Sequence, residues 1–283
     1  MKKHRWFAGL AVMVMALAVV GCSNPSSGNE FPLDSSGGSG NSSGTGNSGV
    51  DYRTCQVGDF ILKDGTILSK DKTPKKNSVA AVIVRAADDR PDGRPALGVG
   101  IVHNKMAWCT KNAAGYNKDI TALYGYLSSG YMFGSDGWDK LKKACSDAEN
   151  NPEEYPAWNY SLTYAETNGL IGDLATGWYL PTLVELFTIC QNRTEIDASL
   201  LKAGGSTFGT SKYWSCCQRP ASDCSGDSDF AQVMECNVGD SCGANKDSND
   251  YYVCSVRAFN ECCVAARIKL FSPKFEFSKL TVI

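Results

Sequence analysis

The sequence predicts an α+β fold in which antiparallel strands and helices occupy separate stretches of the chain. Three β-type runs come first, helical spacing fills the middle, and short β-type segments return up to Phe259. A regular alternation of strand and helix would predict a doubly wound sheet, whereas this grouping favours α+β. The stretch 51–259, about 210 residues, is long enough for one domain with a substantial core.

The first residues of the chain predict export. Basic residues precede an apolar run from Trp6 to Val20, so we interpret residues 1–21 as a signal peptide. The ending AVVGC resembles the lipobox of bacterial lipoproteins, which implies that Cys22 is lipidated and holds the chain to a membrane. An uncleaved helical anchor with an incidental cysteine is the alternative.

Residues 22–50 consist mostly of Ser, Gly and Asn after the lipidated cysteine. Such a composition cannot bury enough apolar area to offset its ordering entropy, so we expect a disordered tether and a folded unit that begins near Cys55. The net charge of −2 and the pI near 5.8 give no electrostatic basis for binding nucleic acid.

The β-type runs have clear boundaries. In VGDFILKDGTIL, Asp64 and Gly65 stand between apolar residues, which predicts a hairpin. SVAAVIVRA, from Ser78, and ALGVGIVH, from Ala96, are nearly continuous apolar runs and predict buried strands.

Helical spacing follows in four places. Apolar residues at i, i+3, i+4 and i+7 predict a helix over 120–127, and similar patterns predict helices over 138–145 and 157–168. Gly169 suits the end of the third helix. Thr182 and Glu185 form a T-x-x-E capping box and predict a fourth helix immediately after Pro181.

Thirteen cysteines are present, and eight of them lie between Cys216 and Cys263. Without Cys22 an even number remains, which permits disulfides in an oxidising compartment. Their scattered placement argues against a complete disulfide framework. The sequence has no CxxC pair and no histidine spaced for zinc, so we expect neither a metal nor a cofactor.

Four motifs carry a family resemblance. GWYLPTLVEL, residues 177–186, resembles the W-x-L-P-T-x-x-E-L signature of the formylglycine-generating-enzyme branch of the C-type lectin fold. YWSCCQ and VCSVRAF resemble its two C-terminal blocks, and GDFILKDGT lies upstream. The resemblance implies a C-type lectin-like domain over 51–259. Within this branch the chain is similar to the variable proteins of bacterial diversity-generating retroelements, of the lipid-anchored Treponema type.

In that family, adenines of AAY codons are randomised, and the resulting NNY codons cannot encode Trp, Met, Gln, Lys or Glu. The resemblance therefore implies a variable segment over about 205–255, with unpatterned cysteines as by-products of randomisation. Because Cys217, Cys224, Cys236 and Cys242 lack the spacing of a disulfide framework, we expect them to be mostly solvent-accessible and dispensable for folding. The residues that NNY cannot encode would belong to the scaffold; they are Trp214, Gln218, Gln232, Met234, Glu235 and Lys246.

The candidate ligand-binding residues all lie in this segment and are of types that NNY codons can encode. They are Cys217, Arg219, Asp223, Cys224, Asp227, Asp229, Phe230, Cys236, Asn237, Asp240, Cys242, Asp250 and Tyr251. We expect Trp178, Leu180, Trp214 and Phe259 to be core residues, and Arg257 to be a structural hydrogen-bond partner. The alternative interpretation of the segment is a set of ordinary turns stiffened by local disulfides.

The function that these features predict is that of a lipid-anchored receptor or adhesin, monomeric and displayed on the outer membrane. Its partner would be a protein or glycan on a host or neighbouring cell. A calcium-dependent carbohydrate-binding lectin is an alternative, for which Asp223, Asp227, Asp229 and Asp240 could supply oxygen ligands. A formylglycine-generating oxidase is a further alternative, but the corresponding block has no histidine, so we do not expect an enzyme.

The sequence departs from the family after Phe259. Residues 260–283 form a basic and apolar extension with an adjacent Cys262-Cys263 pair, and we assign no role to it.

Overall fold

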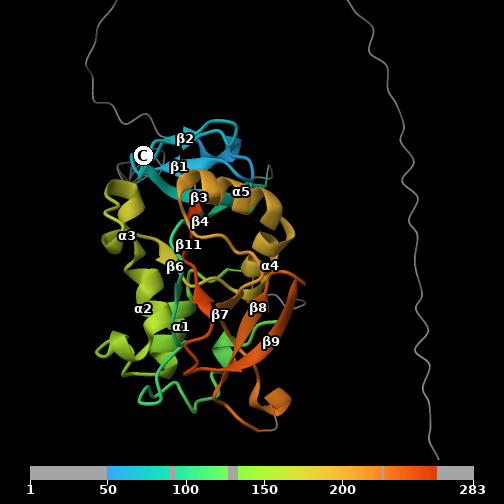
Figure 1. Ribbon diagram of the computed structural model, residues 1–283. Helices are drawn as coiled ribbons and strands as arrows, with labels where there is room; N and C mark the ends of the chain where they lie inside the picture. Colours follow the sequence, from blue (N-terminus) through green and yellow to red (C-terminus); the bar gives the residue numbers. More distant parts are fainter. Residues whose placement is uncertain (1–49, 89–92, 127–132, 225, 260–283) are drawn as a thin grey trace, which may run out of the picture. The chain divides into compact units, whose positions relative to one another are not determined.

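The strands of the domain form two β-sheets, which the helices flank (Figure 1). The computed structural model describes residues 50–88, 93–126, 133–224 and 226–259. Within these residues it has five α-helices. The mixed α+β prediction is confirmed.

The first sheet has six strands in the order β2-β1-β3-β4-β11-β6, and all of its pairs are antiparallel. The strands are β1 (Phe60–Leu62), β2 (Ile67–Leu68), β3 (Val79–Arg85), β4 (Ala96–Gly100), β6 (Trp178–Tyr179) and β11 (Val256–Phe259).

The second sheet has five strands in the order β5-β10-β7-β8-β9. β10 and β7 run parallel, and the other pairs are antiparallel. The strands are β5 (Asn104–Lys105), β7 (Lys212–Gln218), β8 (Phe230–Glu235), β9 (Asp240–Asn245) and β10 (Tyr252–Val253).

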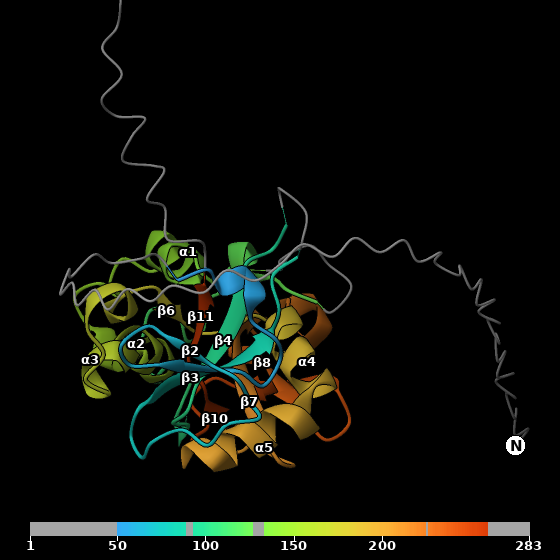
Figure 2. The same ribbon diagram turned by 90° about the horizontal axis from the view of Figure 1, so that it is seen from above.

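The helices lie in two groups on either side of the strands, with α1 to α3 on one side and α4 and α5 on the other (Figures 1 and 2). They are α1 (Gly137–Ala144), α2 (Pro156–Leu162), α3 (Tyr164–Thr167), α4 (Leu183–Gln191) and α5 (Arg193–Ala203). Short 3-10 turns are η1 (Tyr52–Thr54), η2 (Thr121–Leu123), η3 (Pro152–Glu154), η4 (Gly172–Ala175) and η5 (Ala221–Cys224).

The predicted hairpin and strands are present. Gly65 has a φ of 84° in the turn between β1 and β2, and the Leu62 amide donates to Thr66 O at 2.9 Å. In β4, a Cβ built on Gly98 would lie 2.6 Å from Phe259 Cε2, so only glycine lets this ring pack against the strand.

Three of the four predicted helices are confirmed. α1 matches 138–145, and α2 with α3 fills 157–168 up to Gly169, whose φ is 64°. The capping box before α4 is complete, because Thr182 Oγ1 accepts from the Glu185 amide and a Glu185 carboxylate oxygen accepts from the Thr182 amide.

The predicted helix over 120–127 is wrong, since the described part holds only the turn η2. The Ile120 amide donates to Gln218 Oε1, and Tyr124 forms a bridge with Gln218, so contacts with β7 replace helical hydrogen bonds. Ile120 and Leu123 are buried as predicted, but in a turn that packs on the second sheet.

The predicted core residues are confirmed, because Trp178, Leu180, Trp214 and Phe259 are each at most 3% exposed. Arg257 is structural as expected: its Nε donates to Thr176 O at 2.8 Å, and Nη2 donates to Asp173 O at 2.6 Å.

Several predictions lie outside the described residues. These concern the signal peptide 1–21, the lipidated Cys22, the tether except for Val50, and the extension 260–283. All described residues belong to one compact unit of the chain.

Candidate binding surface

The segment with the candidate residues forms most of the second sheet, and its scaffold and candidate residues differ in burial. Five of the six residues that NNY codons cannot encode are at most 4% exposed, namely Trp214, Gln218, Gln232, Met234 and Lys246. The sixth, Glu235, is partly exposed and forms an ion pair with Lys212 at 2.8 Å. Eleven of the thirteen candidates, by contrast, are exposed or partly exposed, and the two that are buried are Cys217 and Cys236.

Two buried glutamines fix the loop before α1 to this sheet. Gln218 accepts from the Ile120 amide through Oε1, and its Nε2 donates to Lys118 O at 2.9 Å and Ser228 O at 3.2 Å. Gln232 Nε2 donates to Gly125 O at 2.6 Å. A buried amide with satisfied donors and acceptors specifies one arrangement of the loop.

Lys246 also holds loops against this sheet, and we call its set of hydrogen bonds the Lys246 clamp. Its ammonium is fully buried and donates to four backbone carbonyls, those of Gly115, Tyr116, Lys118 and Ser228, at 2.7 to 3.2 Å. It also lies 5.2 Å from the centre of the Trp108 ring. Burial lowers the pKa of Lys246 to about 8. The side chain thereby ties the end of β9 to loops from two distant parts of the chain.

Four candidates and Tyr126, which is not a candidate, form a group at the end of the sheet near η5, and we call this group the loop cluster. It consists of Tyr126, Arg219, Asp223, Cys224 and Phe230. The Tyr126 hydroxyl donates to Asp223 Oδ2 at 2.8 Å. A Cβ built on Gly243 would lie 3.2 Å from Arg219 Cδ and 3.5 Å from Phe230 Cδ1, so both side chains lie against β9.

A second group, the strand cluster, lies on one face of the sheet. It consists of Lys212, Glu235, Asp240, Cys242 and Tyr251. Lys212, Glu235 and Asp240 stand opposite one another across three strands, and Cys242 follows Asp240 by two residues on the same face. Tyr251 joins them by packing edge-on against Trp214, with ring centres 4.9 Å apart. The hydrogen bond to Glu235 raises the pKa of Lys212.

Asn237 lies apart from both groups, in the turn between β8 and β9. This turn borders a hollow of about 260 Å³ whose other walls come from α4 and α5. Val238, next to Asn237, is 65% exposed. The length of a six-residue strand, about 20 Å, separates this turn from the loop cluster.

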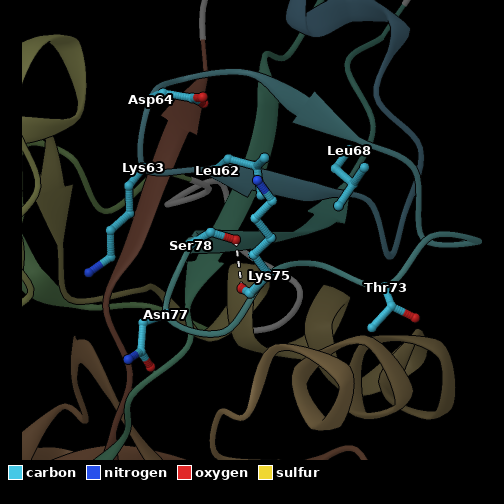
Figure 3. A pocket seen from close by; sticks show the side chains of 8 residues that line it. All are labelled: Leu62, Lys63, Asp64, Leu68, Thr73, Lys75, Asn77 and Ser78. Atoms are coloured by element: carbon cyan, nitrogen blue, oxygen red, sulfur yellow. Dashed lines mark hydrogen bonds between the residues drawn. The ribbon is translucent and has the colours of Figure 1, made fainter.

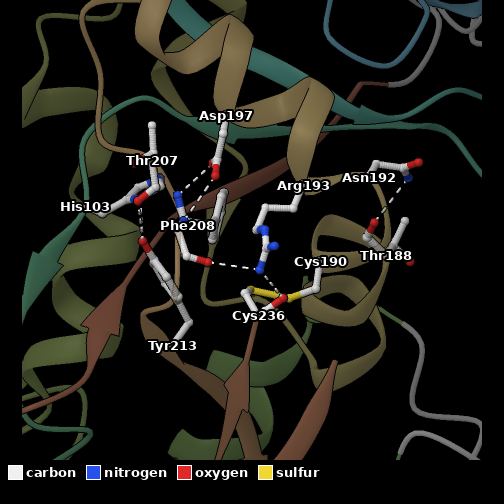
Figure 4. Close-up of a disulfide and its surroundings, with 11 residues drawn as sticks. His103, Thr188, Cys190, Asn192, Arg193, Asp197, Thr207, Phe208, Tyr213 and Cys236 are labelled. Atoms are coloured by element: carbon white, nitrogen blue, oxygen red, sulfur yellow. Dashed lines mark hydrogen bonds between the residues drawn. A yellow bond between two sulfur atoms is a disulfide. The ribbon is translucent and has the colours of Figure 1, made fainter. Parts of the chain in front are cut away.

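Cys236 is buried, so the expectation that its thiol is solvent-accessible is wrong. It is 3% exposed and forms a disulfide with Cys190, 46 residues earlier, which joins the start of the turn to α4 (Figure 4). Arg193 Nη1 donates to Cys236 O at 2.8 Å and to Gly209 O at 3.0 Å. Cys236 therefore belongs to the scaffold.

Cys217 is also wrongly predicted as accessible, because it is fully buried in β7 next to Cys216. The Cys217 amide donates to Ser215 Oγ at 3.1 Å. Cys224 and Cys242 are partly exposed and unbonded, as expected.

The remaining aspartates divide by exposure. Asp227 and Asp250 are exposed. Asp229 is half-buried and structural: its Oδ2 accepts from Asn245 Nδ2 at 2.8 Å, and its backbone oxygen accepts from the Lys246 amide. Tyr126 was not among the predicted residues, because it lies 97 residues before its partner Asp223 and no local sequence pattern indicates that contact.

A second hollow lies far from these groups, between the β1–β2 hairpin and the loop 73–78. It measures about 470 Å³, and Figure 3 shows the side chains around it. Its lining residues are Leu62, Lys63, Asp64, Leu68, Thr73, Lys75, Asn77 and Ser78, none of which is a candidate.

The described residues contain no group of three or more His, Cys, Asp or Glu side chains that could hold a metal ion. They also contain no helix that is both long and apolar enough to span a membrane.

Comparison with solved structures gives a match of fold. No protein-family model and no curated protein matches the sequence. The crystal structure of a fimbrial protein from Bacteroides ovatus ATCC 8483, at 1.85 Å resolution, matches with a TM-score of 0.51 and 14% sequence identity. The match covers 72% of this chain and 49% of that protein, so it spans about half of the fimbrial protein's length. At this identity the match shows similarity of fold alone.

Proposed function

We propose that the chain is a surface-displayed lipoprotein that binds ligands through a diversifiable surface on a C-type lectin-like scaffold, as a receptor or adhesin. The observation that carries this proposal is the separation by burial within residues 213–254. Five of the six residues that NNY codons cannot encode are buried, and most residues that such codons can encode reach solvent.

A binding surface of this kind needs a rigid support, because ordering flexible loops on binding costs affinity. Three sets of contacts hold the candidate surface of this chain in place: the buried glutamines, the Lys246 clamp and the Cys190–Cys236 disulfide. Substitutions at the exposed positions leave all three intact. The fold similarity to a fimbrial protein is consistent with a cell-surface role.

Paired libraries test the proposal without knowledge of the natural ligand. One library randomises six exposed or partly exposed positions with NNY codons, namely Arg219, Asp223, Asp227, Asn237, Asp240 and Tyr251. The matched control randomises buried positions of the same segment, namely Trp214, Gln218, Gln232, Met234, Lys246 and Ser215. Both are displayed on yeast, sorted for folded protein by resistance to protease, and selected for binding to lysozyme.

We expect most members of the surface library to stay folded, because exposed substitutions usually change stability by about 0.5 kcal/mol or less. Binders to lysozyme should then emerge. The control library should lose folding in most members, since replacing a buried Trp alone costs about 3 to 5 kcal/mol. Equal loss of folding in both libraries would contradict the proposal.

A further inference from the structure

The four edges of the two sheets differ in length. β2 and β6 end the first sheet and β5 begins the second, and each has two residues. β9 ends the second sheet with six residues, and no strand of the described residues pairs with its outer side (Figure 1). Natural proteins protect exposed edges by short strands, prolines or lysines, and β9 contains neither proline nor lysine.

The register with β8 shows which groups of β9 face outward. The Lys246 amide donates to Asp229 O, so these two residues form a hydrogen-bonded pair at the end of the ladder. Such pairs alternate along antiparallel strands, so Ser241, Gly243 and Asn245 direct their backbone groups away from β8.

The two ends of this edge are partly occupied. The Ser241 amide donates to Asp240 Oδ1 at 2.7 Å, and Asn245 O accepts from the Ser248 amide at 3.0 Å. Gly243, between them, has an outward N–H and C=O without a partner among the described residues. Both ends of β9 are also held in place, by the disulfide before it and by the Lys246 clamp after it.

The charge of the surroundings selects the partner. Residues 219–250 carry seven carboxylates and two cations, a net charge of −5 in a chain whose total is −2. One of the two cations, Lys246, is buried. The exposed carboxylates include Asp240 at the start of β9 and Asp223, Asp227 and Asp250 in the flanking loops.

We propose that the outer edge of β9 receives an extended lysine- or arginine-rich segment of a partner protein as an additional strand. This inference rests on the proposed function and names the class of ligand that this variant of the surface binds. Backbone hydrogen bonds to Gly243 provide strand pairing, and the carboxylates select positive side chains. Alternate side chains of the added strand meet Cys242 on one face and Arg219 with Phe230 on the other.

Three synthetic peptides test the proposal on the purified full chain. The first is a fluorescein-labelled decapeptide of alternating lysine and valine, and the second replaces each lysine with glutamate. The third is the lysine–valine peptide with N-methyl groups at every second residue, which removes the amide donors of one edge and keeps the charge. Binding is measured by fluorescence anisotropy at low and high salt.

We expect the lysine–valine peptide to bind about tenfold more tightly than the glutamate–valine peptide, with the difference reduced at high salt. N-methylation should weaken binding about fivefold for each strand hydrogen bond lost. Equal binding of the methylated and unmethylated peptides would show attraction by charge alone and would overturn strand addition. Absence of saturable binding would overturn it as well.

Variants of the chain locate the site. Gly243→Pro removes the central outward N–H, and proline is tolerated where an edge N–H faces solvent, so peptide affinity should fall about fivefold. Asp240→Asn with Asp250→Asn should weaken binding about threefold per charge. The matched control, Glu149→Gln with Glu166→Gln, changes the net charge equally at exposed positions near the α1–α3 helices and should have no effect.

If Gly243→Pro fails to fold, the methylated peptide still decides the question on the unmodified chain. Light scattering tests whether a second copy of the chain pairs with this edge instead of a partner protein. Dimerisation that Gly243→Pro abolishes, together with no peptide binding, would assign the edge to a second copy of the chain. If the surface library folds and binds lysozyme while no peptide binds, strand addition fails and the diversifiable surface stands.

Discussion

Replacing Cys236 with serine should destabilise the chain by about 4 kcal/mol under oxidising conditions. The disulfide joins residues separated by 46 positions. The loop-closure entropy removed from the unfolded chain, about 2.1 + 1.5R ln 46, is about 13.5 cal/mol/K, which is about 4 kcal/mol at 25 °C. The sulfur pair also holds the β8–β9 turn against α4, so its loss loosens one end of the candidate surface.

Urea unfolding followed by tryptophan fluorescence measures this change. Cys190→Ser should match Cys236→Ser, and the double variant should add little, because either substitution removes the same bond. A reducing agent should lower the stability of the unmodified chain by a similar amount. The matched control is Cys242→Ser in the strand cluster, whose partly exposed, unbonded thiol should change stability by about 0.5 kcal/mol or less.

The refuting result is a loss of about 1 kcal/mol or less in Cys236→Ser together with no effect of the reducing agent. The two cysteines would then be unbonded in solution, and Cys236 would be dispensable, as the sequence pattern alone suggested. Mass spectrometry of a non-reduced digest decides between the two cases directly.

Three further predictions concern buried polar groups. Burial lowers the pKa of His103 to about 4. The unfolded chain therefore takes up a proton below about pH 6.5 that the folded chain does not, so the free energy of unfolding should fall by up to about 3 kcal/mol between pH 6.5 and pH 4. Urea unfolding of His103→Gln at several pH values should lack this part of the pH dependence. Thr182→Ala should cost about 1 kcal/mol through loss of the helix cap, whereas Thr182→Ser should be nearly neutral in thermal unfolding. Lys246→Met should cost more than about 3 kcal/mol because four carbonyls lose their donor, whereas Lys212→Met, which breaks a surface ion pair, should cost about 1 kcal/mol or less in the same urea assay.

The parts of the fold that the sequence predicted are those fixed by local chemistry. The hairpin at Asp64-Gly65 needs a residue that tolerates positive φ, and the capping box at Thr182 and Glu185 satisfies amides only three residues apart. The strands β3 and β4 are predicted by their apolar runs because both faces are buried.

The parts that it missed depend on distant contacts. Ile120 and Leu123 have helical spacing, yet Gln218, about a hundred residues later, takes the Ile120 amide. Helix α5 has no clear apolar stripe, since Ile196, Ser199 and Leu200 are its buried residues, and it was not predicted. Periodicity cannot show either arrangement, because tertiary packing overrides local preference.

The candidate site shows the same division. Residue types that NNY codons exclude identified buried scaffold positions, including the polar Gln218, Gln232 and Lys246, which composition alone would place at the surface. The Cys190–Cys236 disulfide was not predicted, because the two cysteines are 46 residues apart and disulfide connectivity cannot be deduced from sequence alone.

Sequencing the gene region for residues 205–255 in a population of the source organism is the sharpest test of a diversifiable surface on a fixed scaffold. We expect differences to collect in adenine-derived codons of exposed residues such as Asp223, Asn237 and Asp240 and to spare the codons of Trp214 and Lys246. We also expect a near-copy of this region elsewhere in the genome. Differences that are spread evenly along the gene, with no such copy, would contradict the claim.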